Sequence, residues 1–517
     1  MKKMYMNTDV NTATFPFFDK VAEQKRITPE MLYPYIDVHR HTQITDFVIN
    51  VFAQVSTSDT DFGVDYADIY EASSEEGGFF SRAKIWEGLY KIQRVHGIDV
   101  YSVWIDRCRQ VGFNPWISFR MNDCHNPDTK APVSENDFFF EARKNGWTLG
   151  EEYGYYRHCL DYSVSEVRSF MLSYTREQLS RYNVYGLELD FLREYHCFKY
   201  LSADMAECRN IMTGFIREVK NIVTDCEKIH GHKIKLMLRL PRDIEHCLYY
   251  GFDPVEMAKE KLIDTVVPSP RFAGSDSGIN VDAWRAALPG VEIIPGIEAA
   301  VGVIDGKFVD TSKEISLGLC ANYLSYAPDG LYFFNYFITP RIFESFYDEM
   351  CESEKERIEG NEPYEKSFIT LQCGADYKTI YQSAIRFVII PEGFEACAGY
   401  PTMWRPIPRE LGECACSFEL RTGAIPKGKK CAVILGFDGE AEGFDVAVNG
   451  TRVGGFEKID MGFIEGIGYQ PRRAVSEKTV CYRGTFDESV LTSPTQIVNV
   501  SSHTEGKILN WVEINVY

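Results

Sequence analysis

Short apolar runs alternate with longer segments of helical periodicity between about residue 30 and residue 345. This rhythm is typical of parallel strands joined by crossover helices, and the clearest helical segments are Val164–Arg181, Ala203–Ile229 and Thr311–Leu324. No Gly-x-Gly-x-x-Gly follows any strand, which argues against a dinucleotide fold and favours a closed barrel. The predicted strands are Tyr35–Val38, Phe47–Ala53, Pro115–Met121, Gly186–Phe191, Ile234–Leu240, Asp264–Pro268, Val291–Ile297 and Leu331–Phe337.

The pattern changes near residue 350. The segment 351–366 is charged and includes Gly360 and Pro363, so we interpret it as a linker. Beyond it, strand-like pieces are separated by Gly, Pro, Asp and Asn, and Asn449-Gly450 between two of them predicts a hairpin. We therefore expect an α/β protein with a (β/α)₈ TIM-type barrel over residues 1–350 and an all-β, jelly-roll-like sandwich over residues 367–517.

Alternation within the strands indicates which side chains face the barrel interior. In Lys235–Leu240 the leucines alternate with Lys235, Met237 and Arg239. The side chains that face the surrounding helices should be apolar, so the alternate, polar positions of each strand are expected to face the barrel interior. By the same argument, Glu188 and Asp190 on Gly186–Phe191 are expected to face the interior.

The active sites of such barrels lie at the C-terminal ends of the strands. Inward polar residues expected at this end are Asn50, Arg120, Asn122, Asp190, Arg239, Glu298 and Asn335. Further candidates for substrate contact are Glu188, Arg193, Glu194, His125 and Tyr336. Because buried charges need partners, an internal ion-pair network with Arg120 and Arg239 is the alternative role for Glu188.

Two carboxyl groups on opposite sides of the barrel opening are typical of a glycosidase. One gives a proton to the leaving oxygen, and the other attacks the anomeric carbon or activates a water molecule. Asp190 and Glu298 are the candidate pair. Gly296 and Glu298 are expected to face the same, inner side of their strand, and because Gly296 has no side chain we expect open space for a ligand beside Glu298. Glu298 is expected to stay ionised and to act as the nucleophile. This chemistry requires a carbohydrate substrate, no metal and no cofactor.

The stretches Leu160-Asp-Tyr-Ser-Val-Ser-Glu-Val-Arg-Ser-Phe and Tyr185-Gly-Leu-Glu-Leu-Asp-Phe-Leu-Arg resemble family-10-like glycoside hydrolases, whose catalytic carboxylates end strands four and seven. The resemblance implies that Asp190 is the acid/base and Glu298 the nucleophile. Where those families carry an Asn-Glu pair, this chain has Leu189-Asp190, so Glu188 and Glu194 are substitutes for the acid/base. The C-terminal region is similar to the β-sandwiches often appended to such barrels.

Composition narrows the function classes. The net charge of −20 disfavours binding to nucleic acid, and no apolar run is long enough to span a bilayer. The N-terminus has no apolar signal region, and fifteen mostly scattered cysteines suit free thiols in a reducing cytoplasm. We expect a cytoplasmic protein with no nucleic-acid or membrane partner; a homo-oligomer is compatible with the sequence.

Two alternatives remain open. Asp37-Val-His-Arg-His41 at the end of the first predicted strand is similar to metal-dependent amidohydrolase barrels, in which both imidazoles reach one metal. Leu189, where the resembled families carry Asn, keeps a catalytically inactive carbohydrate-binding barrel under consideration.

Overall fold

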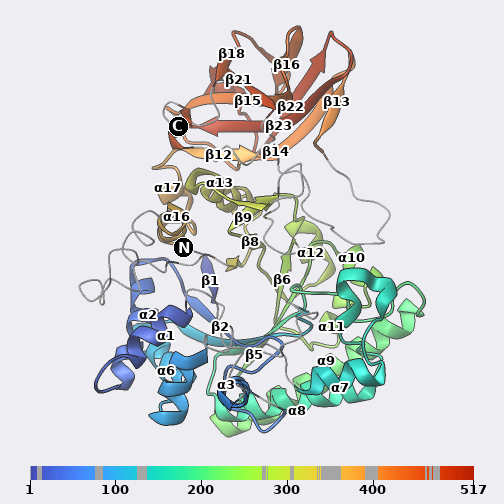
Figure 1. Cartoon of the computed structure of the whole chain (residues 1–517). Coiled ribbons are helices and arrows are strands. Elements are labelled where there is room, and N and C mark those ends of the chain that lie inside the picture. The colour runs from blue at the N-terminus through green and yellow to red at the C-terminus, as the bar shows by residue number, and fades with distance from the viewer. Residues whose placement is uncertain are drawn as a thin grey trace.

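Figure 1 shows the computed structural model of the protein. The described residues are 2–8, 14–63, 65–75, 86–124, 137–270, 275, 277–302, 308–334, 336, 338, 362–389, 406–459, 463–464, 468–469 and 478–517.

The first part of the chain forms a curled parallel sheet. Its strands are β1 (Lys3–Thr8), β2 (Asp46–Phe52), β3 (Asn114–Arg120), β4 (Gly186–Asp190), β5 (Lys235–Pro241), β6 (Thr265–Ser269), β7 (Glu292–Ile293), β8 (Gly296–Glu298) and β11 (Gly330–Phe334). The sheet order is β7-β6-β5-β4-β3-β2-β1-β11-β8, so pairing follows the order of the chain around the curl. The result is an α/β, barrel-like fold.

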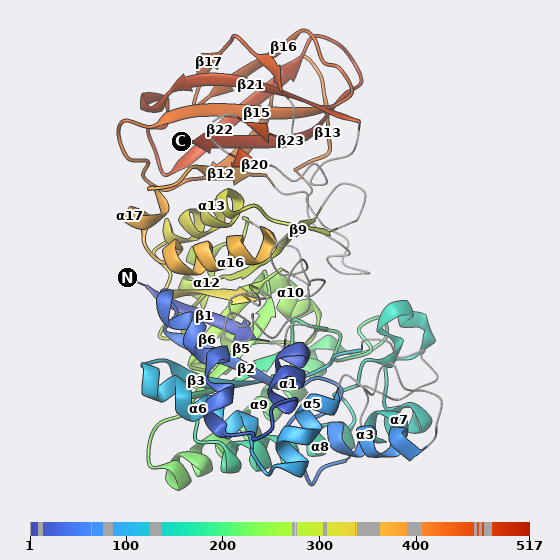
Figure 2. The ribbon, with the colours of Figure 1, turned by 60° about the vertical axis from the view of Figure 1, so that its left-hand side comes forward.

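Helices lie between successive strands and cover the outer side of the curled sheet (Figures 1 and 2). They are α1 (Thr14–Ala22), α2 (Pro34–Asp37), α3 (Tyr66–Glu75), α5 (Glu87–Tyr90), α6 (Val100–Val111), α7 (Asp137–Asn145), α8 (Ser165–Arg181), α9 (Met205–His230), α10 (Ile244–Tyr249), α11 (Pro254–Lys259), α12 (Val281–Ala287), α13 (Lys313–Leu324), α16 (Glu362–Cys373) and α17 (Tyr377–Ile380). The three helical segments predicted from periodicity correspond to α8, α9 and α13.

The first predicted strand is wrong. Residues 34–37 form α2, with Pro34 in its first turn, and Val38–His41 continue as a 3₁₀ helix. Proline suits the first turn of a helix because its missing N–H is not needed there. The first strand is instead β1, which pairs with β2 on one side and with β11 on the other. The other predicted strands agree with the observed ones to within a few residues.

The seventh predicted strand is divided. β7 pairs with β6 and β8 pairs with β11, while Ile294 and Pro295 lie between them. Proline has no N–H to donate to a strand ladder. The two ends of the sheet are therefore segments that follow each other directly in the chain.

The predicted alternation along the strands is confirmed. Leu236, Leu238 and Leu240 join the large apolar core shared with the helices. A separate small cluster fills the inside of the curl and consists of Tyr5, Val48, Trp116, Met237, Val267, Ile294, Tyr332 and Phe334. Glycine is required at position 186, because a Cβ there would lie 2.2 Å from the Trp116 ring.

The last part of the chain, from Ile385, forms two antiparallel sheets that we call the β unit. One sheet contains β12 (Ile385–Val388), β13 (Arg409–Leu411), β15 (Lys430–Asp438), β18 (Glu457–Ile459), β21 (Thr479–Asp487) and β23 (Lys507–Val516), and the other contains β14 (Cys416–Arg421), β16 (Phe444–Val448), β17 (Thr451–Val453) and β22 (Thr495–Ser502). Two further short pairs are β9 (Ala300–Gly302) with β10 (Phe308–Asp310), and β19 (Phe463–Ile464) with β20 (Gly468–Tyr469). The predicted hairpin is confirmed: Asn449 and Gly450 have positive φ and join β16 to β17.

Helices connect the two parts of the molecule. The end of the expected linker, from Glu362, begins α16, which packs against α13, and Lys366 Nζ donates to the carbonyl of Ala299 at 2.7 Å. On its other side α13 contacts β12 of the β unit (Figure 2). All residues of α13 from Glu314 to Leu324 are buried. The β unit therefore lies directly on a helix of the α/β part.

Gly318 permits this contact. A Cβ at Gly318 would lie 2.0 Å from the backbone oxygen of Arg386 in β12. We expect Gly318→Ala to lower the free energy of unfolding by about 2 kcal/mol, since the overlap is with backbone and one layer must shift. Urea titration measures this loss. Gly214→Ala on α9 is the matched control: a Cβ there would lie 3.9 Å from Nη1 of Arg217, an ordinary van der Waals contact, so it should stabilise by about 0.5–1 kcal/mol. A Gly318→Ala protein as stable as this control would contradict the tight contact.

Candidate active site

Asp190, Arg239 and Glu298 lie together at the C-terminal ends of β4, β5 and β8. Nη1 of Arg239 donates to Oδ1 and Oδ2 of Asp190 at 3.2 and 3.1 Å, and Nη2 donates to Oε1 of Glu298. The Arg239 guanidinium lies 3.9 Å from the centre of the Phe334 ring. The two carboxylates predicted as a pair therefore bind the same guanidinium.

The two carboxylates have different surroundings. Asp190 has contacts on both oxygens, and Oδ1 also accepts the backbone N–H of Leu192 at 2.9 Å. Glu298 is completely buried, and its Oε2 has no hydrogen-bond partner within the part of the chain that the structure describes. Burial raises the pKa of Glu298 to about 7, against the opposing effect of Arg239. The direction of this shift is opposite to the one that the sequence predicts for Glu298, because burial has a larger effect than the nearby cations.

Glu188 lies one layer deeper on the same side of β4. Its Oε2 accepts a hydrogen bond from Nδ2 of Asn7 at 3.0 Å, and the hydroxyls of Ser118 and Tyr332 lie close to the carboxyl group. The expected ion-pair network of Glu188 with both arginines does not form: Arg239 binds Asp190 and Glu298, and Arg120 pairs with Asp123 at 3.2 Å. The register explains this, since Asp190, not Glu188, is aligned with Arg120 and Arg239 on the neighbouring strands.

The open space expected beside Glu298 is absent. A Cβ at Gly296 would lie 1.9 Å from the Ser269 hydroxyl, so that side chain from β6 fills the position. Glycine at 296 therefore lets two strands approach each other and leaves no room for a ligand at that point.

A second buried ion-pair group lies next to the first. Asp123 Oδ2 is 3.2 Å from Nη1 of Arg120 and 3.6 Å from Nε of Arg193, and all three side chains are buried. The charges of Arg193 and Arg120 both oppose the raised pKa of Glu298, which has burial as its largest cause. These arginines, both predicted as site residues, therefore contribute positive charge close to Glu298.

The remaining predicted site residues are held by other contacts. Asn50 donates to the carbonyls of Phe52 and Ser118, and the amide of Asn122 binds backbone groups of Leu160 and His196. The Tyr336 hydroxyl donates to Ser316, and Glu194 is a buried neighbour of Cys159, whose thiol pKa is raised mainly by burial. His125 and Asn335 lie outside the described residues.

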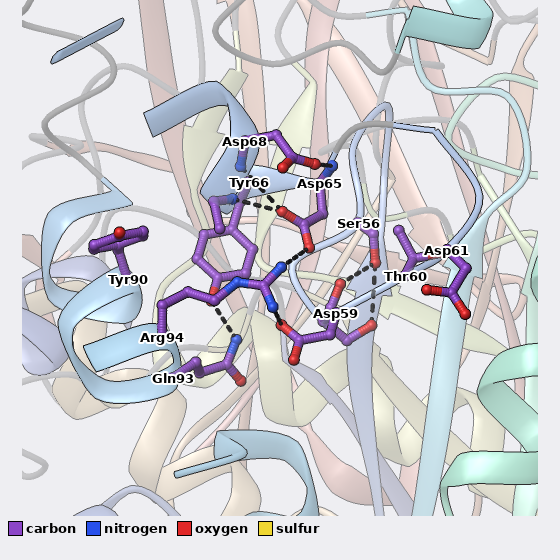
Figure 3. A network of polar contacts seen from close by, with 12 residues as sticks. Ser56, Asp59, Thr60, Asp61, Asp65, Tyr66, Asp68, Tyr90, Gln93 and Arg94 are labelled. Carbon is purple, nitrogen blue, oxygen red and sulfur yellow. Dashed lines mark hydrogen bonds and ion pairs between the residues drawn. The ribbon is translucent and has the colours of Figure 1, made fainter. Parts of the chain in front are cut away.

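The loop after β2 is fixed by a separate polar network (Figure 3). Arg94, on a π-helical turn over residues 91–95, forms ion pairs with Asp65 at 2.7 Å and Asp59 at 3.3 Å. The adjacent Gln93 donates to the Tyr66 hydroxyl at 2.7 Å. Each of these contacts joins the loop to its own flanking helices, so we assign the network to loop anchoring.

The predicted metal-binding histidines do not end a strand. His39 and His41 lie on the 3₁₀ helix that follows α2. Nδ1 of His39 contacts the backbone oxygen of Tyr35 at 3.1 Å, its ring is buried against Phe47, and burial lowers its pKa to about 4. His41 is exposed. Within the described residues, no group of three or more His, Cys, Asp or Glu side chains is arranged to hold a metal. The strand geometry that suggested an amidohydrolase is wrong.

Sequence reasoning missed several residues of the site. Asn7 lies on the unpredicted strand β1, and the Ser275 hydroxyl binds both the N–H and the carbonyl of Glu298, at 3.0 and 2.5 Å. Neither residue belongs to a motif. Asp123 directly follows a predicted candidate, so its proximity to Arg120 was the signal that could have identified it. Near the end of β4, His196 stacks between Tyr156 and Tyr195, with ring centres 3.6 and 4.5 Å away.

The chain was compared with known proteins. No family model and no curated sequence matches it. Among solved structures it is similar to a cycloisomaltooligosaccharide glucanotransferase of Paenibacillus sp., with 8% identity, a TM-score of 0.35, and coverage of 99% of this chain and 57% of that one. It is also similar to an endo-β-1,4-mannanase of Thermotoga petrophila, with 11% identity, a TM-score of 0.41, and coverage of 99% and 97%.

A third similar structure is α-L-fucosidase isoenzyme 2 of Paenibacillus thiaminolyticus, with 10% identity, a TM-score of 0.39, and coverage of 75% of this chain and 51% of that one. The chain thus spans little more than half the length of the glucanotransferase and the fucosidase. Likenesses of this size assign neither substrate nor activity. Among the described helices, none has the length and hydropathy of a bilayer-spanning segment.

Proposed function

We propose that this protein is a glycoside hydrolase whose catalytic pair is Asp190 and Glu298. The observation that supports it is the meeting of these carboxylates, from the ends of β4 and β8, on the Arg239 guanidinium. The C-terminal strand ends are where α/β barrels carry their catalytic residues. A pair of carboxylates in different environments is what acid-assisted cleavage of a glycosidic bond requires.

The surroundings favour the opposite assignment of roles from the one that the family resemblance implies. Glu298, with a pKa near 7 and an unpartnered Oε2, is the proposed proton donor to the leaving oxygen. Both oxygens of Asp190 accept hydrogen bonds from Arg239, so Asp190 is the proposed nucleophile or base. The Ser275 hydroxyl fixes the backbone of Glu298 and so holds the donor in place.

At the level of the fold, we propose a closed (β/α)₈ barrel of the TIM type. In it, Glu292–Glu298 is one strand interrupted at Pro295, which joins the two ends of the sheet. We propose that α16 and α17 associate with the barrel and that the β unit is a jelly-roll-like sandwich. The strand β22 supports a two-layer arrangement, because every second residue along it is buried.

Turnover of a panel of nitrophenyl glycosides tests the function directly. The panel should include both anomers of hexoses, pentoses and deoxyhexoses, since the described residues do not select one sugar. Hydrolysis of at least one member, abolished by Glu298→Gln and retained by Glu207→Gln on the exposed side of α9, is the expected result. A panel with no turnover by pure, folded protein would refute glycosidase activity on these sugars.

Chelation distinguishes this chemistry from metal-assisted hydrolysis. The proposed mechanism uses only carboxyl groups, so dialysis against EDTA should leave the rate of hydrolysis unchanged. The assay compares the initial rate before and after dialysis, and again after addition of Zn²⁺ or Mn²⁺. Loss of activity that a divalent ion restores would overturn the two-carboxylate mechanism.

One observation favours a second function, carbohydrate binding without catalysis. Asp190, Arg239 and Glu298 are each no more than 1% exposed, and both carboxyl groups bind the guanidinium. In that case sugars that are not hydrolysed would still bind, as calorimetry with the free monosaccharides would show. The activity panel separates the two functions, because a binding protein gives heat without turnover.

A further inference from the structure

Glu188 is the third carboxyl group of the candidate site and has no role in the mechanism above. It lies two residues before Asp190 on β4, so both side chains extend from the same side of the strand. Glu188 is fully buried: its Oε2 accepts a hydrogen bond from the Asn7 amide, and the neutral hydroxyls of Ser118 and Tyr332 also lie close to the carboxyl group. An ionised carboxylate in such surroundings is unfavourable unless a cation neutralises it.

The groups that face Glu188 come from five strands. They are Asn7 from β1, Ser118 from β3, Asp190 from β4 itself, Arg239 from β5 and Tyr332 from β11. Arg239 is the one cation in this set, and its two terminal nitrogens are directed to Asp190 and Glu298. The nearby Arg120 and Arg193 pair with Asp123 instead, and Glu188 makes no ion pair among the described residues.

We propose that Glu188 is a positioning residue that holds a proton near neutrality and thereby leaves Arg239 to Asp190 and Glu298; its effect on catalysis rests on the proposed glycoside hydrolysis. Loss of that proton would place a second anion directly beneath Asp190. The new charge would attract the guanidinium toward the deeper layer and weaken its contact with Glu298. Burial, followed by the charge of Asp190, raises the pKa of Glu188 to about 7, which agrees with this arrangement.

Infrared spectroscopy tests the proton without any substrate. At pH 6, the difference spectrum between wild type and Glu188→Gln should contain the C=O stretching band of a protonated, buried carboxyl group. In wild type this band should disappear as the pH rises through about 7–8. Glu207→Gln, on an exposed surface, should give no such band. Absence of the band from the Glu188→Gln difference spectrum at pH 6 would overturn the proposal.

One further measurement does not need Glu188→Gln, and a second applies when that variant folds. Titration of Glu298→Gln should still show one buried carboxyl band that is lost above neutral pH, and its absence would count against the proposal. Because the pKa of Glu188 is raised in the folded state, stability should decrease as pH rises from about 4.5 to about 7. For folded Glu188→Gln, the decrease in Tm between pH 5 and pH 8 should be smaller than in wild type by about 3 °C.

The pH profile tests the catalytic consequence. If both Glu188 and Glu298 must be protonated, log kcat should fall above neutral pH with a slope of about −2 in wild type and about −1 in Glu188→Gln. Equal slopes in the two proteins would refute the positioning role. The infrared measurement is independent of activity, so a protein that hydrolyses no glycoside still shows whether Glu188 holds its proton.

Discussion

Glu298→Gln is expected to lower kcat for an unactivated glycoside by roughly three orders of magnitude, or about 4 kcal/mol of barrier. Glutamine retains an oxygen that accepts from Arg239, so the site should keep its shape, but it cannot give a proton to the leaving oxygen. Sugar binding should change little, because the lost interaction belongs to the transition state. Steady-state kinetics combined with calorimetric binding of the free sugar measure both effects.

The leaving group identifies the role of Glu298. A dinitrophenolate leaves without protonation, so a dinitrophenyl glycoside should lose no more than about tenfold in Glu298→Gln if the residue is the proton donor. An equally large loss with both substrates would assign the nucleophile to Glu298 and return the proton to Asp190. Near-normal turnover of both substrates, with an inactive but folded Glu194→Gln, would show that the site residues are wrongly assigned.

Arg239→Met should destabilise the protein by about 3–5 kcal/mol, the usual cost of leaving buried charges without their partner. Two carboxylates, Asp190 and Glu298, would lose their shared cation. The loss should be smaller at pH 5.5 than at pH 8, because Glu298, with a pKa raised to about 7, takes up a proton at the lower pH and then needs no cation. Urea unfolding at the two pH values measures the difference.

The control for this change is Arg217→Met. Arg217 also makes two hydrogen bonds to one carboxylate, Glu260, at 2.8 and 2.7 Å, but the pair lies at the surface. Its removal should leave the free energy of unfolding nearly unchanged, since water replaces the lost contact. If Arg217→Met and Arg239→Met were equally mild, the buried cluster would not depend on its cation.

The strand pattern predicted the arrangement of the site better than its electrostatics. Along Lys235–Leu240 and Gly186–Phe191, every second residue is apolar and packs against the surrounding helices. The residues between them must therefore face the interior, and this identified Arg239, Glu188 and Asp190. That is enough to place Asp190 and Glu298 at one end of the sheet. It does not reveal which groups share the one guanidinium.

The errors have physical causes. Strand β1 ends with the polar residues Asn7 and Thr8, and both are buried against residues distant in the sequence. Because polar residues are not expected in a central strand, the sequence pattern did not predict β1. Pro34 signalled the helix that was mistaken for this strand. The pKa of Glu298 depends on how completely other segments cover it; Ser275 contacts its backbone and Ser269 contacts Gly296, and neither serine belongs to a motif. Such contacts are set by tertiary packing.

Helix α13 also limits how this protein can have been assembled in evolution. An accessory domain can move between unrelated enzymes only if its partner remains soluble alone. Here the residues of α13 from Glu314 to Leu324 are all buried, and β12 covers one side of the helix. A chain that ended before Ile385 would expose that side to water. Loss of the β unit would therefore require compensating substitutions on α13, so we expect the two parts to have been inherited together.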